Sequence, residues 1–284
     1  MPDPSIENTR EYLVVKSNAL IQRSRYTMPL SLQKTFAYIC SLIRPPCEAN
    51  NYSWPSDLLT YSFDIRDFCR TCGRNPGAGG SAREYAKYSL KALADESIYL
   101  DMGSGKEVLC RWLDEVKIDK DGIVTITIGR YLAPYLLNLK ERFTQYQLWN
   151  ILTMKSAYSI RLYELLRSYI NLGEVTFSVD ELRKLLFIKG SSCKKCRLNN
   201  TKSCLTCEEY KSFYRQFKEF KKKVLVPAVA EITEKSDITV TMKVIIKNRN
   251  ASHVQFNIKQ LDSYFTHIGI LIANEELDKK KRKD

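Results

Sequence analysis

The chain has 284 residues, of which 44% are hydrophobic and 27% are charged. These values are ordinary for a globular protein, and the length suffices for one large domain or two modest ones without disulfides. No apolar run reaches about 18 residues, so we expect no membrane partner. Residues 1–7 lack the basic and apolar regions of a secretory signal, which predicts a cytoplasmic protein.

The formal net charge is +13 and the isoelectric point is near 9.2. An excess of positive charge attracts polyanions, and nucleic acid is the commonest polyanion in a cell. The same excess could merely keep a protein in solution, so the positions of the cations have to decide. Nine cysteines in a chain without a secretory signal favour reduced thiols or a metal site over disulfides.

Hydrophobic periodicity and turn residues predict the elements of the first half of the chain. After a short ordered element at residues 12–24, we expect a helix from Pro29 to Ile43, ended by Pro45-Pro46. The elements that follow are a strand at 61–64, helices at 65–72 and 81–96 around a glycine-rich loop, and strands at 98–101, 108–118 and 123–128. Asp121-Gly122 is a hairpin turn signal between the last two strands.

The second half of the chain repeats this order. The expected elements are a helix at 153–170, a strand at 174–178, a helix to Phe187 opened by the capping box Ser178–Glu181, a long helix at 208–232, and a hairpin of strands 238–247 and 253–259. Three helices followed by a β-hairpin, the wing, are the order of a winged helix. The sequence therefore predicts an α+β protein with two tandem winged-helix domains related by pseudo-symmetry, at residues 1–144 and 145–262, and a basic tail at 263–284.

The helix expected at 208–232 carries the most informative pattern. At about 100° per residue, apolar side chains share one face and cations share the opposite face. The apolar face holds Phe213, Phe217, Phe220 and Val224, and the cationic face holds Lys211, Arg215, Lys218 and Lys222. An ordinary solvated face mixes both signs, but Glu219 is the only acid in 210–223. The pattern favours a recognition helix, because Lys and Arg neutralise phosphates and Arg pairs with guanine edges. The alternative is an ordinary amphipathic surface helix.

Two other regions supply candidates for DNA contact. In the second hairpin they are Lys243, Lys247 and Arg249, near a turn that could reach a phosphate or the minor groove. At the start of the helix 153–170 they are Lys155, Ser156, Ser159 and Arg161, beside backbone N–H groups that also favour phosphate. We expect Lys155 and Arg161 to stay available for phosphate while the other face packs. The alternative is a core helix whose polar residues are merely solvated.

An insertion at 189–207 holds two CxxC pairs, which is the spacing of a structural tetrathiolate zinc site. The four candidate ligands are Cys193, Cys196, Cys204 and Cys207. Free thiols in a flexible insertion, or a redox role, are the alternatives. The insertion is basic and has no acid, so if zinc orders it, it could brace the start of the helix 208–232 or touch DNA itself. Cys69 and Cys72 form a third CxxC without a partner pair, which we interpret as structural.

Catalytic interpretations find little support in the sequence. The two histidines, His253 and His267, do not form the His-x-His metal site that DNA-nicking enzymes place beside a tyrosine. There is no GxxxxGK[ST] phosphate loop either, which argues against an ATPase. We therefore expect a protein that is not an enzyme and that has no cofactor other than structural zinc. The basic run 279–283 is interpreted as a solvated tail that can add non-specific phosphate affinity.

Three stretches of the chain resemble a known family. The run 144–166, most specifically Ser156-Ala157-Tyr158-Ser159-Ile160-Arg161-Leu162-Tyr163-Glu164-Leu165, is similar to the signature of the winged-helix replication initiators of iteron-type plasmids. The stretch 217–232 resembles the recognition helix of that family, and 18–41 resembles the opening of its first domain. The cysteine insertion departs from the family pattern, so the geometry between the last two helices of the second domain stays open.

The resemblance implies a plasmid replication initiator that binds repeated sites in double-stranded origin DNA as a monomer, with both winged helices. It implies that the protein helps to open the origin and recruits host replication initiator and helicase proteins. It also implies that two copies form a homodimer through the first domain, and that this domain makes an auxiliary DNA contact. Repression of the protein's own gene is a further implication. A winged-helix transcriptional repressor without a replication role is the main alternative, and a nicking enzyme is the third.

The two CxxC pairs predict about one equivalent of zinc per chain, since four thiolates complete a tetrahedral site. Elemental analysis of protein purified without added metal measures this directly, and a chelator should then lower the thermal stability. Less than about a tenth of an equivalent, with no change in stability under chelation, contradicts the zinc site.

Overall fold

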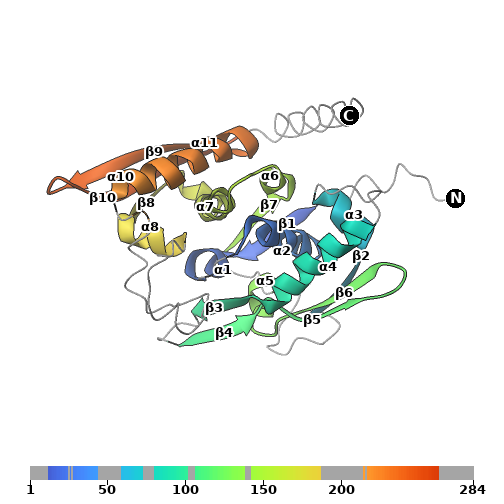
Figure 1. Ribbon diagram of the computed structural model, residues 1–284. Helices are drawn as coiled ribbons and strands as arrows, with labels where there is room; N and C mark the ends of the chain where they lie inside the picture. Colours follow the sequence, from blue (N-terminus) through green and yellow to red (C-terminus); the bar gives the residue numbers. More distant parts are fainter. Residues whose placement is uncertain are drawn as a thin grey trace, which may run out of the picture. The chain divides into compact units, whose positions relative to one another are not determined.

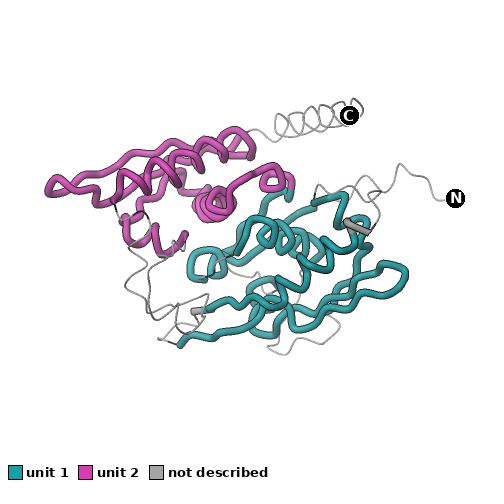
Figure 2. Tube along the Cα trace, viewed as in Figure 1, with its two compact units in different colours: residues 1–148 teal, residues 149–284 magenta. Residues whose placement is uncertain are grey.

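The computed structural model describes residues 12–24, 26, 28–43, 59–72, 80–101, 106–137, 142–186, 214 and 216–261. The chain forms two compact units, Met1–Leu148 and Trp149–Asp284 (Figure 2). The division falls after Leu148 rather than after residue 144, because the strand β7 (Phe143–Gln147) pairs with β1 (Leu13–Ser17) and so belongs to the first unit.

The first unit is organised around a helix, a short strand, two helices and a hairpin (Figure 1). These elements are α2 (Leu30–Leu42), β2 (Thr60–Asp64), α3 (Ile65–Thr71), α4 (Gly80–Asp95), β5 (Leu113–Ile118) and β6 (Ile123–Ile128). The remaining elements are α1 (Asn18–Arg23), α5 (Ala133–Leu137), the paired strands β3 (Ser97–Asp101) and β4 (Glu107–Arg111), and the pair β1 and β7. The strand β2 pairs with β6, which pairs with β5.

The second unit repeats this plan. Its elements are α6 (Trp149–Leu152), α7 (Ala157–Arg167), a 3-10 turn (Ile170–Leu172), β8 (Glu174–Ser178), α8 (Val179–Leu185), α10 (Phe217–Phe220), a π turn (Lys221–Leu225), α11 (Val226–Lys235), β9 (Ile238–Lys247) and β10 (Asn250–Gln260). The sheet order β8-β10-β9 matches β2-β6-β5 in the first unit. Both units thus have winged-helix order, which confirms the expected α+β fold. The expected tail at 263–284 lies outside the described residues.

In both units a helix follows the short strand without a loop, because the last strand residue caps the helix. The Asp64 carboxylate accepts a hydrogen bond of 2.6 Å from the Arg66 N–H at the start of α3. The Ser178 hydroxyl accepts one of 3.1 Å from the Glu181 N–H at the start of α8, as its capping box predicts. In the described part of the chain, no helix combines the length and apolarity that crossing a bilayer requires.

The expectation of one strand at 108–118 is wrong. The chain forms two strands there, β4 and β5, which belong to different sheets and are separated by Trp112. The Trp112 side chain is 1% exposed and packs edge-on against Tyr26 and Phe36, with ring centroids 4.8 and 4.3 Å away. Burial of this indole turns the backbone out of the β4 ladder. Gly129 lies against the Arg111 carbonyl at the same place, where a Cβ would collide with the backbone.

A buried tyrosine joins three elements of the second unit. The Tyr163 hydroxyl on α7 donates a hydrogen bond of 2.7 Å to Asp237 before β9 and accepts one of 3.1 Å from Asn150 on α6. Arg167 completes the group with an ion pair of 3.3 Å to Asp237. Burial, and then the adjacent Asp237 carboxylate, raises the pKa of Tyr163 well above its ordinary value, so the hydroxyl stays protonated as the donor.

Replacing Tyr163 by Phe removes a donor to Asp237 and an acceptor from Asn150 while keeping the ring. Because both partners are then left short of a hydrogen bond in a buried place, we expect the free energy of unfolding to fall by about 1–3 kcal/mol. Urea denaturation measures the change. Tyr131→Phe is the matched control, since Tyr131 is 52% exposed. Equal stability of the two variants would show that the Tyr163 hydroxyl adds nothing.

Candidate nucleic-acid interface

In the second unit, α10, the π turn and α11 continue as one helix over 217–235, which is called the third helix here because it follows α7 and α8 in the winged-helix order. The sequence pattern predicts a helix from Glu208, whereas the helix that the structure describes begins at Phe217, and 208–213 lie outside the described residues. Tyr214 has a φ of 56°, and Gln216 is extended with φ −82° and ψ 134°. A regular right-handed helix cannot run through a residue in the left-handed region. Lys211 and Arg215, the two candidate cations of the expected first turns, lie outside the described residues.

Arg183 on α8 holds the backbone at the point where this helix begins. Its guanidinium donates a hydrogen bond of 2.9 Å to the Tyr214 carbonyl, and its Cζ lies 5.3 Å from the centroid of the Phe220 ring. The Arg183 side chain is 6% exposed, so the pair is shielded from water. The charge-assisted hydrogen bond and the cation–π contact together hold the start of the third helix against α8.

The apolar side of the third helix is buried against α7 and β9. Phe220 and Val224 belong to it as expected, Phe217 is half-buried, and Phe213 lies outside the described residues. The opposite side is exposed and carries four lysines: Lys218, Lys221, Lys222 and Lys223. The sequence analysis predicted Lys218 and Lys222 on this side but missed Lys221 and Lys223. In a regular helix only residues three or four apart share a face, so the pattern did not place these two lysines with the others.

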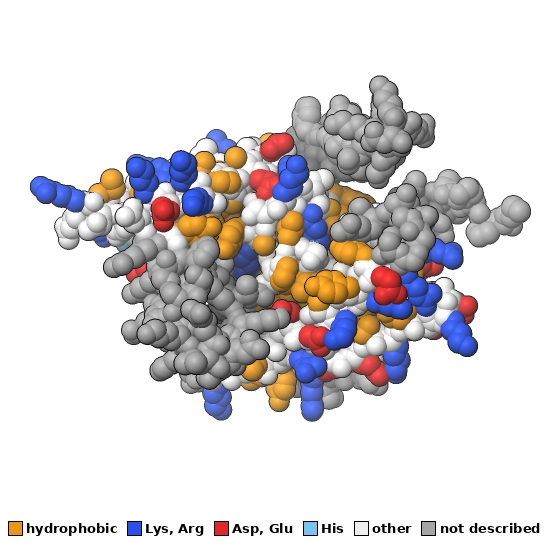
Figure 3. All heavy atoms as spheres, in the orientation of Figure 1, with side chains coloured by type: hydrophobic (Ala, Val, Ile, Leu, Met, Phe, Trp, Pro, Cys, Tyr) orange, Lys and Arg blue, Asp and Glu red, His pale blue; other side chains and the backbone are white. Residues whose placement is uncertain are grey.

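The four lysines on the third helix are not neutralised within the part of the chain that the structure describes, where none of them forms an ion pair. The corresponding helix of the first unit, α4, is different. There Lys87 pairs with Glu84 at 3.0 Å, and Lys91 pairs with Asp95 at 2.8 Å. In Figure 3, Lys and Arg side chains gather over α10 and the start of α11, with red side chains further along α11, whereas red and blue side chains alternate over the first unit. Of these two corresponding helices, the one in the second unit therefore carries the row of lysines without ion pairs among the described residues.

The hairpin of β9 and β10 ends in a two-residue turn, Asn248-Arg249, with φ values of 50° and 63°. Two successive positive φ values are the geometry that continues the strand twist across a tight hairpin. Arg249 and Lys247 are exposed at this tip. Lys243 lies further down β9, and its side chain alternates with those of the buried inner face.

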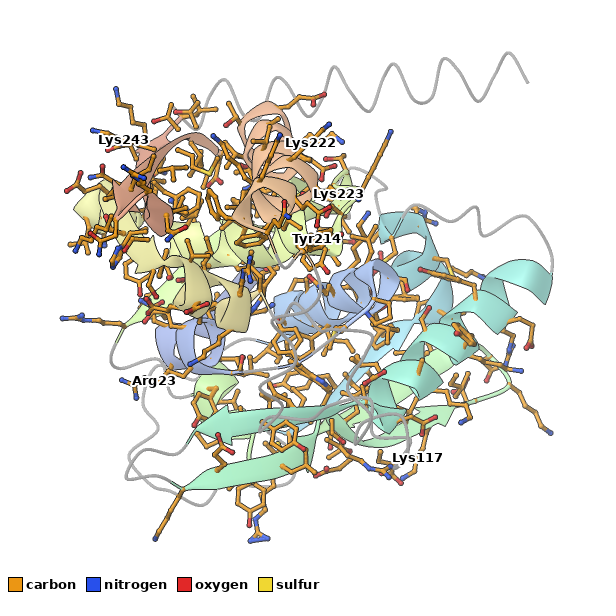
Figure 4. The ribbon with its side chains drawn as sticks, turned by 60° about the vertical axis from the view of Figure 1, so that its left-hand side comes forward. Arg23, Lys117, Tyr214, Lys222, Lys223 and Lys243 are labelled. Atoms are coloured by element: carbon orange, nitrogen blue, oxygen red, sulfur yellow. The ribbon has the colours of Figure 1, made fainter. Side chains whose placement is uncertain are left out.

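Lys243 therefore leaves the sheet on the face away from α11. Figure 4 agrees, with Lys243 on one side of the unit and Lys222 and Lys223 on the other. The structure thus brings Lys218 and Lys222 to one surface but does not bring Lys243 to it.

The start of α7 differs from the expectation that its polar residues are available for phosphate. The Ser156 hydroxyl caps the helix, accepting hydrogen bonds of 3.2 and 3.4 Å from the N–H groups of Tyr158 and Ser159. Ser159 is 0% exposed, and Arg161 is 6% exposed. The Arg161 Nε donates a hydrogen bond of 3.3 Å to the Leu185 carbonyl at the end of α8. Of the four candidates in this region, only Lys155 has an exposed side chain.

Glu231 ties the third helix to the start of α7. Its carboxylate accepts hydrogen bonds of 2.6 Å from the Lys155 backbone N–H and 3.0 Å from the Lys235 ammonium, which also donates to the Thr153 carbonyl at 3.3 Å. Burial by itself raises the pKa of Glu231, but these donors and the nearby Ser159 hydroxyl outweigh burial and lower it below the ordinary value. The charged carboxylate is thus the form that fixes the helix in place.

The four candidate zinc ligands, Cys193, Cys196, Cys204 and Cys207, lie outside the described residues. Within those residues, no group of three or more metal-ligand side chains occurs. Cys69 and Cys72 form no disulfide, and burial raises the pKa of the Cys72 thiol to about 12, with Cys69 adding to the shift. A thiol that stays protonated is a poor nucleophile and a poor metal ligand, which fits a structural role for this third CxxC.

Comparison with known families decides what kind of protein carries this interface. Residues 13–167 match the family described as Initiator Replication protein, WH1, and residues 178–258 match Initiator Rep protein, WH2. The chain belongs to the family of initiator replication proteins. The match confirms the resemblance, and it gives this replication initiator one WH1 and one WH2 winged helix, in that order along the chain. The WH1 match runs through α7, beyond the end of the first compact unit.

Replacing Glu231 by Gln removes the charge that Lys155 and Lys235 bind. A carboxyl whose pKa is lowered on folding stabilises the folded state above its unfolded pKa, and this contribution is lost as the pH falls through the folded pKa. Glu231→Gln should therefore lower the free energy of unfolding by about 1–3 kcal/mol near neutral pH. The difference from wild type should shrink as the pH drops below 4.5, the ordinary value for Glu.

Urea denaturation at a series of pH values measures this difference. Glu219→Gln is the control, because Glu219 is exposed on the same helix and should change stability little. A Glu231→Gln deficit that stays constant down to about pH 3 would assign the effect to packing and not to the carboxylate charge.

Proposed function

We propose that this initiator binds repeated sites in double-stranded plasmid origin DNA, with the second winged helix as the main reader. On this proposal the protein helps to open the origin and recruits host replication initiator and helicase proteins, and it represses its own gene. It acts by binding and not by catalysis. The first winged helix adds an auxiliary DNA contact and joins two copies in a homodimer.

The observation that carries the proposal is the row of unpaired lysines on the third helix of the second unit. Lys218, Lys221, Lys222 and Lys223 are exposed on an element whose other side is anchored by Phe220, Arg183 and Glu231. A rigid cationic helix of this kind matches the width and charge of a DNA major groove. The balanced charges of α4 support a lesser electrostatic role for the first unit.

The hairpin tip and the start of α7 extend this surface in the proposal. Arg249 and Lys247 would contact phosphates or the minor groove beside the major groove that the helix occupies. Lys155 would contact a phosphate near the start of α7. Ser156, Ser159 and Arg161 would act indirectly, by capping α7 and by joining it to α8. Arg215 and Lys211 keep the role expected from the sequence, and Arg215 is the candidate for base reading.

Single alanine substitutions of Lys218 and Lys222 test the helix assignment. Each should weaken binding to the cognate repeat and to random duplex alike, and each should reduce the slope of log affinity against log salt by about 1, because one phosphate contact is lost. Fluorescence anisotropy over a series of salt concentrations measures both quantities. Lys243→Ala is the charge-matched control on the opposite face of the sheet. Salt slopes that are the same for all three variants would remove the third helix from the interface.

Replication and repression are separated by a transformation experiment. DNase footprinting of the sequence that flanks the gene identifies the repeats. A plasmid that carries only those repeats and the gene should then replicate in a permissive host. Failure to replicate, with the footprint intact, would favour a transcriptional repressor. A covalent protein–DNA adduct after incubation with supercoiled origin DNA and a divalent metal would favour a nicking enzyme.

A further inference from the structure

The third helix of the second unit contains one irregular turn. Lys221–Leu225 form a π turn between α10 and α11, and the Val226 N–H donates to the Lys221 carbonyl, five residues earlier. Such turns take more residues per turn than an α-helix and often occur at functional sites. The three consecutive lysines of the exposed face, Lys221–Lys223, lie inside this turn.

One cause of the π turn is Pro227, which follows it in the first turn of α11. Proline has no N–H, and in a regular helix its ring crowds the carbonyl four residues earlier, here that of Lys223. Widening the turn before the proline relieves this contact without ending the helix. The position of Pro227 in the sequence therefore favours the irregular turn whether or not a ligand is bound.

The second cause is the spacing of the buried residues. Phe220, Val224, Ala228 and Ile232 are each four residues apart, and their exposed fractions are 0, 2, 1 and 0%. At about 100° per residue, a regular helix would rotate the stripe by about 40° at each step and by about 120° from Phe220 to Ile232. One extra residue between Phe220 and Ile232 reduces this rotation to about 20° and so brings all four side chains onto one narrow line facing the core.

The extra residue in the π turn decides whether Phe220 or Lys221 is buried in the core. In a regular helix with Leu225, Ala228 and Ile232 buried, the same face would continue to Lys221 and would turn Phe220 away by about 100°. Burying an unpaired ammonium costs several kcal/mol, and exposing the phenyl ring forfeits about 1.5–3 kcal/mol. With the π turn, Phe220 is buried and Lys221 is exposed.

We propose that the π turn is a DNA-docking element, which presents Lys221, Lys222 and Lys223 as one set of phosphate contacts continuing the face of Lys218. Three successive residues of an α-helix span about 200°, and in a π turn they span a smaller arc. Figure 4 shows Lys222 and Lys223 projecting together from the helix. This inference rests on the proposed function, since it assumes that the second unit binds duplex DNA.

Two variants of equal charge test the geometry. In both, Pro227→Ala removes the proline constraint. In the first variant Lys222 is deleted, so the turn can become a regular α turn with Phe220 still on the core face. In the second, Lys222→Ala keeps the chain length and with it the π turn. We expect the deletion variant to bind cognate duplex at least about tenfold more weakly than the substitution variant, because Lys221 and Lys223 lose their phosphate positions. Equal affinities would overturn the proposal.

Lysine acetylation of the wild-type protein gives a second readout that does not depend on whether the deletion variant folds. With cognate duplex bound, Lys221 and Lys223 should be protected as strongly as Lys222. Protection of Lys222 alone would overturn the proposal. If the wild-type protein binds no duplex DNA, the proposed function fails first. If it binds but the two lysines stay reactive, only the role of the π turn fails.

Discussion

The third helix of the second unit must bury a stripe of apolar side chains while four lysines on the same helix stay exposed to solvent. Phe220 and Ile232 stand at the two ends of the stripe, and both are 0% exposed. Burying one large apolar side chain stabilises a fold by about 1.5–3 kcal/mol, and one backbone hydrogen bond contributes about 0.5–1.5 kcal/mol net. Side-chain burial therefore outweighs helix regularity, and the direction of every lysine on the exposed face follows from that balance.

The two units share one fold but differ in the charge on the exposed face of the third helix. Strand order, the caps at Asp64 and Ser178, and the succession of helices agree between them. The exposed faces of their third helices do not agree, because α4 pairs its lysines with acids one turn away. Membership of the initiator family fixes the shared plan. The distribution of unpaired charge is what distinguishes the two winged helices as candidate DNA readers.

Local patterns in the sequence were sufficient to predict the bounds of several elements that are next to a tight turn or a helix cap. The strands β6, β8 and β9 have the predicted bounds, and β2 and α3 agree to within a residue. The pairing of β1 with β7 was missed, because its two strands come from opposite ends of the unit and no local signal names a distant partner. The break at Trp112 was missed for a related reason: period-two alternation continues across a residue that tertiary packing pulls out of the strand.

The candidate site was predictable only in part. Exposure of Lys218 and Lys222 followed from helical periodicity, whereas burial of Arg161 depends on the Leu185 carbonyl, which another helix supplies. The start of the third helix was misplaced because a left-handed residue at Tyr214 leaves no mark in the hydrophobic pattern. Two signals for the irregular turn were present in the sequence: the four-residue spacing from Phe220 to Ile232, and Pro227 within it.

The tip of the second hairpin holds a residue that folding alone does not favour. Arg249 has a φ of 63°, where a Cβ meets the following carbonyl at a cost of about 1–2 kcal/mol that glycine avoids. A glycine at this position would avoid that cost and would leave the apex uncharged. The most stable wing that this backbone allows is therefore a wing without its outermost cation, so stability and charge at the tip cannot be maximised together.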